Sequence, residues 1–210
     1  MRINIRQVAV CTVMAVVCGS RAPAQERFAL PIFNAAAPEE MGVSRVTAGC
    51  SAAEDAFLVG VRGSLWVLDG LQVFGELDSM TWDRRGVGPT IQVGGAYTLP
   101  LDISADLAVR GAVYKPFADG DRDMAGATIC CVVGRDLEAF VPGVSVYGSA
   151  GFDWRWGTVD LPDGRSASED DFSPTLGIGA QWRINDILSA WFEAALDDRL
   201  FGGIGMGMSF

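Results

Sequence analysis

The stretch that decides the fold is VRGSLWVLDGLQVFGEL, which covers residues 61–77. In its first half every second position is apolar or glycine, namely Val61, Gly63, Leu65 and Val67, and the first two positions between them are the polar Arg62 and Ser64. This alternation is typical of a β-strand with one apolar face and one polar face. The alternation resumes at Leu71, directly after Asp69-Gly70, a pair that favours a tight hairpin turn. The stretch therefore predicts a β-hairpin.

The same design occurs twice more along the chain. Val93–Leu99 and Ile178–Ile184 repeat the order branched, small, bulky, aliphatic on one face, and each leads through a turn into another alternating run. Repeated hairpins indicate an antiparallel up-and-down sheet. The longer polar segments 79–88, 115–126 and 157–173 are predicted to be loops, and a bulge is expected near Gly134. The nine strands that the pattern predicts are 57–68, 71–80, 89–99, 101–114, 127–140, 143–156, 174–184, 187–197 and 201–210.

Charged side chains of both signs occupy the face opposite the apolar one, at strand-centre positions. They are Arg62, Glu76, Asp106, Arg110, Asp153, Arg155, Arg183 and Glu193. A soluble barrel hides its apolar face in the lumen, whereas a membrane barrel shows that face to lipid and keeps charges inside. Tyr97, Trp154, Trp156 and Trp182 lie near the ends of the apolar face, where interfacial aromatic girdles form. The sequence thus favours an all-β, closed antiparallel transmembrane β-barrel, with a secreted soluble barrel that binds a hydrophobic ligand in its lumen as the alternative.

The number of strands follows from closure. Lipid cannot satisfy an open sheet edge, and single-chain bacterial barrels have even strand numbers, so nine strands require either a tenth or the loss of one. Of the range from eight to ten we favour ten, with one strand before residue 56. Neither Phe28–Phe33, which Pro31 interrupts, nor Gly42–Cys50 is a good candidate for that strand. With eight strands, part of 57–80 protrudes as an arm.

The N-terminal residues have the order of a secretory signal peptide. Arg2 and Arg6 precede a short apolar run from Val8 to Cys18, and small residues follow up to Ala24. The run is too short for a transmembrane helix, which needs about 20 apolar residues. We therefore expect residues 1–24 to be a cleaved signal, residues 25–55 to be an extension that could contain a first strand, and residues 56–210 to form the barrel.

The composition excludes several kinds of chemistry. The chain has no histidine, which rules out imidazole bases, His-containing triads and HExxH zinc sites. It has 16 basic and 26 acidic side chains, an unlikely balance for a nucleic-acid partner. After signal cleavage three cysteines remain, Cys50, Cys130 and Cys131, and no spacing among them suggests a metal site. A bridge from Cys50 to one of the adjacent pair and three buried free thiols are both open interpretations.

The lumenal charges allow two interpretations. They form either a salt-bridged polar plug that compensates buried charge in a narrow barrel, or the lining of a minor pore. The plug is favoured because side chains nearly fill the interior of an eight-strand barrel and two more strands add little room. We expect a structural, adhesive or minor pore role, without catalysis, cofactor or metal.

The chain resembles the small bacterial outer-membrane β-barrel proteins, the OmpA- and Opa-like transmembrane domains. The resemblance rests on the Ala22-Pro23-Ala24 signal end, the three hairpins and the alternation from Ile204 to Phe210. It implies a location in the outer membrane of a Gram-negative bacterium after signal cleavage, with outer-membrane lipid and lipopolysaccharide as surroundings. It also implies that the terminal strand, with Phe210, Met208, Met206 and Ile204, is the signal read by the barrel-assembly machinery. Oligomeric state, ligand and receptor are left open.

Overall fold

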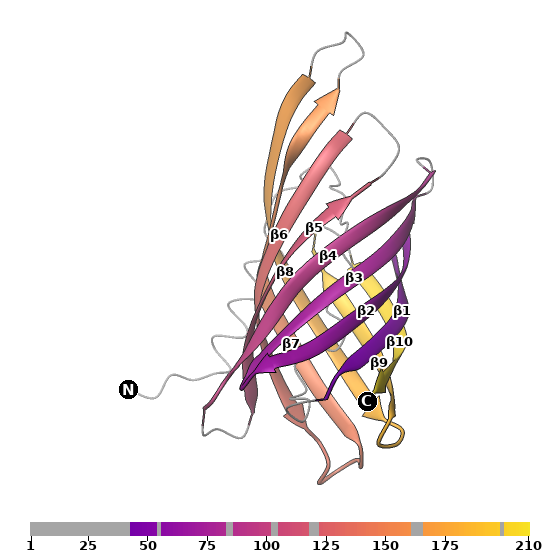
Figure 1. The fold of residues 1–210 in the computed structure, drawn as a ribbon, viewed down its shortest axis with the longest axis vertical. Coiled ribbons are helices and arrows are strands. Elements are labelled where there is room, and N and C mark those ends of the chain that lie inside the picture. The colour runs from indigo at the N-terminus through magenta and orange to yellow at the C-terminus, as the bar shows by residue number, and fades with distance from the viewer. Residues whose placement is uncertain are drawn as a thin grey trace.

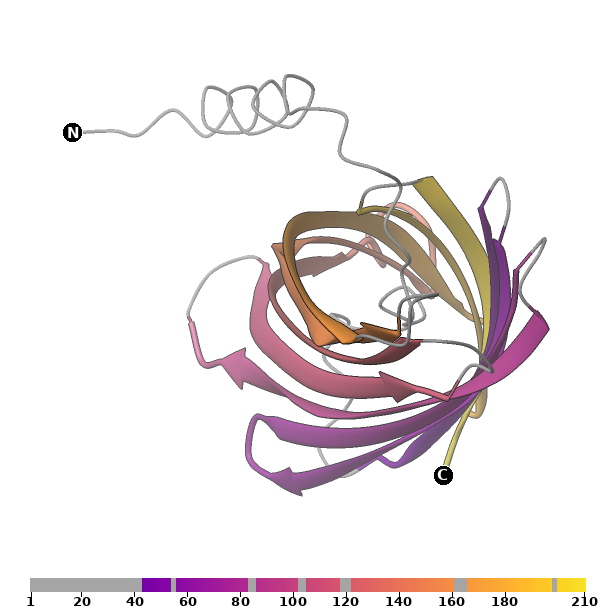
Figure 2. The ribbon, with the colours of Figure 1, turned by 90° about the horizontal axis from the view of Figure 1, so that it is seen from above.

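The chain forms one closed antiparallel barrel in which each strand pairs with its neighbours in sequence and β1 pairs with β10 (Figures 1 and 2). The computed structural model describes residues 43–53, 56–82, 86–101, 105–117, 122–160, 166–197 and 200–210. The predicted signal peptide lies outside these residues. The strands are β1 (Arg45–Ala53), β2 (Ala56–Leu68), β3 (Leu71–Trp82), β4 (Gly86–Leu99), β5 (Asp106–Pro116), β6 (Arg122–Asp136), β7 (Val144–Asp160), β8 (Ser166–Arg183), β9 (Leu188–Leu196) and β10 (Leu200–Ser209).

The described residues confirm ten strands, but the source of the tenth corrects the sequence analysis. We judged Gly42–Cys50 a poor candidate, yet it supplies most of β1. This strand pairs along one side with β2, from Ala53 opposite Ala56, and along the other with β10, from Arg45 opposite Ser209. Its alternation is faint because small side chains dominate both of its faces. The pairing of β1 with both neighbours therefore comes from closure of the sheet rather than from a strong apolar pattern.

Two further expectations were wrong. The register between β6 and β7 runs without a shift from Arg122 to Asp136, so there is no bulge at Gly134; the shift that the structure describes lies between Trp66 and Leu68. The three predicted loops are each mostly strand. In 79–88, β3 continues to Trp82 and β4 begins at Gly86; in 115–126, β5 continues to Pro116 and β6 begins at Arg122; in 157–173, β7 continues to Asp160 and β8 begins at Ser166. Outside an apolar environment a strand needs no apolar face, so backbone pairing continues there after the sequence alternation has faded.

The apolar face points outward and the charged face inward. The exposed fractions of Val61, Val93, Phe152, Ile178 and Phe192 are 49%, 52%, 48%, 67% and 56%. The inward positions of the same strands hold buried charged residues such as Arg62, Asp153 and Glu193. This distribution matches a barrel in lipid and contradicts the alternative of a soluble barrel with an apolar lumen.

The outer aromatic residues mark two levels. Trp182 and Tyr97 lie near one end of the barrel, and Trp154 lies near the other, where it pairs with Phe172. Ten positions of β8 separate Phe172 from Trp182, which corresponds to roughly 33 Å along the strand and, at a tilt of ~40°, to about 25 Å along the barrel axis. That separation equals the height of the apolar band of outer-membrane barrels.

The two ends of the barrel differ. One end, called here the short-turn end, carries the turns 69–70 and 137–143, where Gly70 and Gly143 have positive φ values of 77° and 74° that favour glycine. The opposite end, called here the long-hairpin end, carries the hairpin of the long strands β7 and β8, which reaches farthest from the barrel body in Figure 1. No helix that could cross a membrane occurs among the described residues.

Candidate functional site

The candidate site is the barrel lumen, whose middle is filled by buried side chains. Four aromatic rings lie against glycines of neighbouring strands, at positions where any Cβ would overlap the ring. Trp191 covers Gly49 and Gly205, and Tyr114 covers Gly126. The other two pairs are Tyr147 over Gly179 and Phe74 over Gly94. Glycine is therefore required at these positions so that large rings can enter a narrow interior.

This packing predicts that Gly205→Val destabilises the barrel. The new side chain would overlap the Trp191 ring and the Ala48 carbonyl oxygen, and overpacking of this kind costs about 1–3 kcal/mol. The measurement is the free energy of unfolding in urea, for the protein folded in lipid vesicles. Gly202→Val is the matched control on the same strand, because a Cβ there meets nothing within 4 Å. Equal effects of the two variants would contradict the packing.

A buried ion pair lies between β2 and β3. Arg62 and Glu76 stand directly opposite each other in the register, and the Arg62 guanidinium donates to the Glu76 carboxylate. The guanidinium carbon of Arg62 lies 4.8 Å from the centroid of the Phe74 ring, and that of Arg110 lies 4.3 Å from it. The ring therefore offers a cation–π contact to two arginines whose charges repel.

A second buried contact lies on the other side of the lumen. The Tyr147 hydroxyl donates a hydrogen bond of 2.6 Å to a carboxylate oxygen of Glu193, and both residues are buried. Tyr147 comes from β7 and Glu193 from β9, so the bond crosses β8. It ties two non-adjacent strands through the interior.

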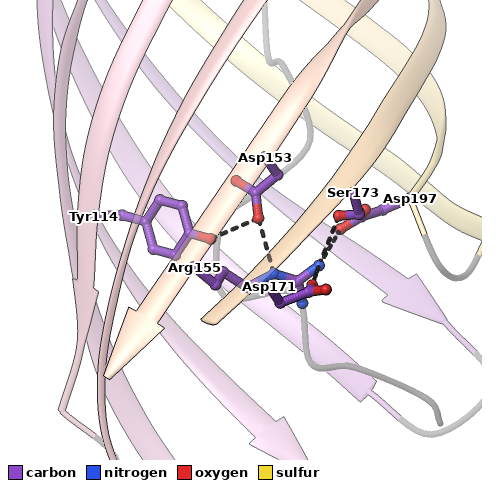
Figure 3. A network of polar contacts seen from close by, with 6 residues as sticks. All are labelled: Tyr114, Asp153, Arg155, Asp171, Ser173 and Asp197. Carbon is purple, nitrogen blue, oxygen red and sulfur yellow. Dashed lines mark hydrogen bonds and ion pairs between the residues drawn. The ribbon is translucent and has the colours of Figure 1, made fainter. Parts of the chain in front are cut away.

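The largest network lies toward the long-hairpin end and is centred on Arg155 (Figure 3). The Arg155 Nε atom lies 3.0 Å from a carboxylate oxygen of Asp153 on the same strand. The same oxygen accepts a hydrogen bond of 2.8 Å from the Tyr114 hydroxyl. The side chains of Arg155 and Asp153 are 3% and 7% exposed, so the pair is screened from solvent. Tyr114 thereby links β5 to β7.

Two more carboxylates face the same guanidinium. The Arg155 Nη2 atom lies 3.4 Å from Asp171 and 3.4 Å from Asp197, and it donates a hydrogen bond of 2.9 Å to the Ser173 hydroxyl. That hydroxyl donates in turn to Asp197 at 2.7 Å. One arginine thus faces three aspartates, and the network joins β7 and β8 to the residue that follows β9. A guanidinium has five N–H donors in a fixed plane and suits this multiple contact.

The predicted lumenal residues are not all brought together. Arg62, Glu76, Arg110, Asp153, Arg155 and Glu193 are buried inside the barrel. Asp106 begins β5 at the short-turn end and is half-buried. The Arg183 side chain is 53% exposed and lies 3.7 Å from a Glu138 oxygen. These two residues lie at the short-turn mouth of the lumen rather than in its buried middle, because alternation identifies the face of a residue but not its depth. Arg183 lines a cavity of about 430 Å³ there, together with Arg45 and Gln181.

Sequence reasoning missed the residues that connect the charges. Tyr114 and Tyr147 carry no charge, so a search for ionisable pairs passes over them, although their inward parity was visible. Asp171 falls in a segment that we assigned to a loop, and Asp197 follows the end of β9. Asp171 stands two positions before Ser173, which faces the lumen from the same strand. Residues two positions apart on a strand face the same side, and this spacing is the signal that would have identified Asp171.

The three cysteines are free. Cys50 lies on β1 and Cys131 on β6, and these strands are diametrically opposite in the ring of ten, so they cannot be bridged within one barrel. Cys130 is buried in the lumen. Among the described residues no group of three or more Cys, Asp or Glu side chains is arranged to hold a metal ion.

The terminal strand presents its apolar side chains outward. Ile204, Met206, Met208 and Phe210 are exposed on the outer surface or at its edge. The backbone of Phe210 exchanges two hydrogen bonds with Ser44, of 3.0 and 3.1 Å, next to the seam between β1 and β10. The end of the chain is therefore held in the sheet.

An outer wall of apolar side chains around a closed sheet, with ion pairs inside, decides the class of fold. The chain folds as a transmembrane β-barrel. No family model and no curated protein matches its sequence. Its structure is similar to that of the KdgM porin in complex with disordered oligogalacturonate, with 8% identity, a TM-score of 0.48 and coverage of 79% of this chain and 99% of that chain.

Two other solved structures are similar in the same way. The COG4313 outer membrane channel from Pseudomonas putida F1 shares 10% identity, with a TM-score of 0.48 and coverage of 87% of this chain and 100% of that chain. Ail, the attachment invasion locus protein of Yersinia pestis, shares 15% identity, with a TM-score of 0.33 and coverage of 81% and 100%. At such identities the likeness concerns the barrel fold.

Proposed function

We propose that this protein is an outer-membrane barrel with a sealed lumen and a structural or adhesive role, without catalysis. The observation that carries the proposal is the burial of inward side chains from strands all around the ring. Thr90, Arg155 and Trp191 are 1%, 3% and 1% exposed, although they come from β4, β7 and β9. A continuous water-filled channel would leave such side chains accessible.

The chemistry of the interior supports the same interpretation. Charges removed from water need close partners, and the interior supplies them through Arg62 with Glu76, Arg155 with its aspartates and Glu193 with Tyr147. Each contact joins two or more strands and cross-links the wall. The eight charged residues named from the sequence are proposed to act as a plug, with six of them buried within the barrel and with Asp106 and Arg183 at its short-turn mouth.

The long-hairpin end supports a role outside the membrane. Beyond Trp156, β7 and β8 stay paired up to Asp160 opposite Ser166 and carry acidic side chains such as Glu169. Outer-membrane barrels have short periplasmic turns and longer extracellular extensions, which places this hairpin at the cell surface and the short-turn end in the periplasm. Export with cleavage after residue 24, a location in the outer membrane of a Gram-negative bacterium, and surroundings of lipid and lipopolysaccharide belong to the same proposal.

The terminal strand is proposed as the assembly signal. Phe210, Met208, Met206 and Ile204 offer an apolar outer edge at the seam between β1 and β10, where the two ends of the sheet meet and where an assembly machinery would act. Met208 stands where an aromatic residue would strengthen this edge.

The proposal predicts that the purified protein, reconstituted in a planar lipid bilayer, gives no stepwise conductance. Unboiled protein from isolated outer membranes should migrate at a shifted position in an SDS gel, which shows that the barrel is folded. The positive control is the triple variant Tyr114→Ala, Tyr147→Ala and Trp191→Ala. This variant removes three of the rings that fill the lumen, so its conductance shows that the assay can detect a pore. Steady conductance of the unchanged protein would overturn the sealed lumen and favour the minor pore.

A further inference from the structure

The outer wall of the barrel is hollowed at one place. A groove of about 950 Å³ crosses the lipid-facing surface of β6 to β10. The register of the strands explains the groove. One row of paired residues across β6 to β10 holds the small residues Gly148, Ala194 and Gly202 next to the bulky Val133 and Ile178. Ile178 is 67% exposed and forms a ridge, and the small residues form the floor. We call this surface the outer groove.

One charged side chain lies at the edge of the outer groove. Arg135 lines it from β6, two residues beyond Val133 and close to the short-turn end. Among the described side chains, the other outward charges on strands are Lys115, Asp123 and Asp170, and all three lie at the long-hairpin end. Lys115 and Asp123 form an ion pair of 2.7 Å, whereas Arg135 makes no ion pair or hydrogen bond with a described residue.

We infer that the outer groove and Arg135 bind a glycerophospholipid of the periplasmic leaflet. The acyl chain lies in the groove, and the guanidinium of Arg135 donates two hydrogen bonds to the phosphate. An apolar channel that ends at a single guanidinium matches a molecule with a hydrocarbon tail and an anionic head, and arginine suits phosphate because its donors are paired in one plane. The periplasmic placement rests on the orientation given under the proposed function.

Charge also separates this occupant from a second copy of the chain. A neighbouring barrel in the same membrane would bring its own outer face to the groove at the same depth. At the short-turn end no described outward strand residue is acidic, and the exposed Glu138 of the turn already faces Arg183, so the outer face of a second copy's strands offers no partner for Arg135. A lipid phosphate does, and it lies at the depth to which an arginine side chain extends at a membrane interface.

The experiment uses the full chain folded in phosphatidylcholine vesicles that contain a trace of spin-labelled lipid. The measured quantity is the fraction of label whose motion the protein restricts, compared between labelled phosphatidylglycerol and labelled phosphatidylcholine. The unchanged protein is expected to prefer the anionic lipid about fivefold, the effect of one basic residue at a lipid surface. Arg135→Gln should abolish the preference, and Lys115→Gln, the control at the opposite end, should keep it. Equal behaviour of the two variants would overturn the inference.

A second pair of variants tests the groove itself. Gly202→Leu fills the groove, and Gly75→Leu adds the same side chain to the outer face of β3, away from it. At both glycines a new Cβ meets nothing within 4 Å, so both variants are expected to fold. Gly202→Leu should halve the restricted fraction or lower it further, and Gly75→Leu should leave it unchanged. Ala194→Leu gives an independent filling of the groove.

The gel shift of unboiled protein separates this inference from the proposed function. Conductance, or a missing shift in the unchanged protein, would refute the proposed function. A shifted, folded protein that shows no preference for phosphatidylglycerol would refute the lipid site alone. Cross-linked dimers that disappear in Gly202→Leu would assign the groove to a second copy and overturn the lipid as its occupant.

Discussion

Val93→Arg is expected to lower the free energy of unfolding in a bilayer by about 2–4 kcal/mol, the cost of a lipid-facing arginine near the midplane. Val93 lies at the middle of β4, is 52% exposed, and has Gly75 and Val113 as its neighbours on the adjoining strands. An arginine there has no described partner within the apolar band and cannot reach water without deforming the membrane. The measurement is urea-dependent folding into phosphatidylcholine vesicles, followed by the gel shift of unboiled protein.

Tyr97→Arg is the matched control on the same strand and the same face. Tyr97 lies at the level of the aromatic girdle, where a charge costs about 0–1 kcal/mol. The difference between the two variants therefore reports depth rather than the presence of charge. If both variants fold equally well, the apolar outer face does not lie in lipid and the transmembrane orientation of this wall is wrong.

Glu76→Leu is expected to destabilise the barrel by about 3–5 kcal/mol, because it leaves Arg62 buried without its carboxylate. The effect should be visible as a lower midpoint of unfolding in urea. Arg62 would still face Phe74, but the guanidinium of Arg110 lies on the same ring and repels it. The loss of the Glu76 anion thus leaves two guanidinium groups close together in a dry interior, with Asp78 as the remaining buried carboxyl beside Arg62.

The double variant Arg62→Met with Glu76→Leu tests the mechanism of that loss. Removing both charges removes the cost of burying one charge without the other, so the double variant should regain most of the stability lost in Glu76→Leu. In other proteins, replacing a buried ion pair by apolar residues is often neutral or even stabilising. Glu138→Gln serves as a control, since its contact with Arg183 is exposed and worth little. A double variant as unstable as Glu76→Leu alone would show that packing volume, not charge, dominates at this position.

The hairpins and the orientation of their faces could be predicted because period-2 alternation is strong where one face meets lipid. From Val61 to Val67 each outward residue is apolar or glycine, and the structure places these side chains outward. The rule fails where the contrast between the faces disappears. β1 has small side chains on both faces, and the upper parts of β7 and β8 have polar residues on both faces. These were the segments that we assigned to an extension and to a loop.

The lumen was predictable as a face but not as a set of contacts. That Arg62 meets Glu76 depends on their register across one turn, which the hairpin makes accessible from sequence. That Arg155 meets Asp197 depends on where β9 ends relative to β8, and local pattern does not contain this information. The bulge expected at Gly134 was wrong for a similar reason: charged residues at a strand end interrupt the alternation without interrupting the pairing.

The seam between β1 and β10 has a consequence for the order of events during biogenesis. The hydrogen bond from Arg45 to Ser209 joins positions separated by 164 residues, so this pairing closes the longest loop in the sheet. Until β10 is in place, β1 and β9 each present a row of unpaired amides and carbonyls, which attract other chains in the same condition. A chain stopped before its last strand would therefore keep two open sheet edges and would tend to aggregate.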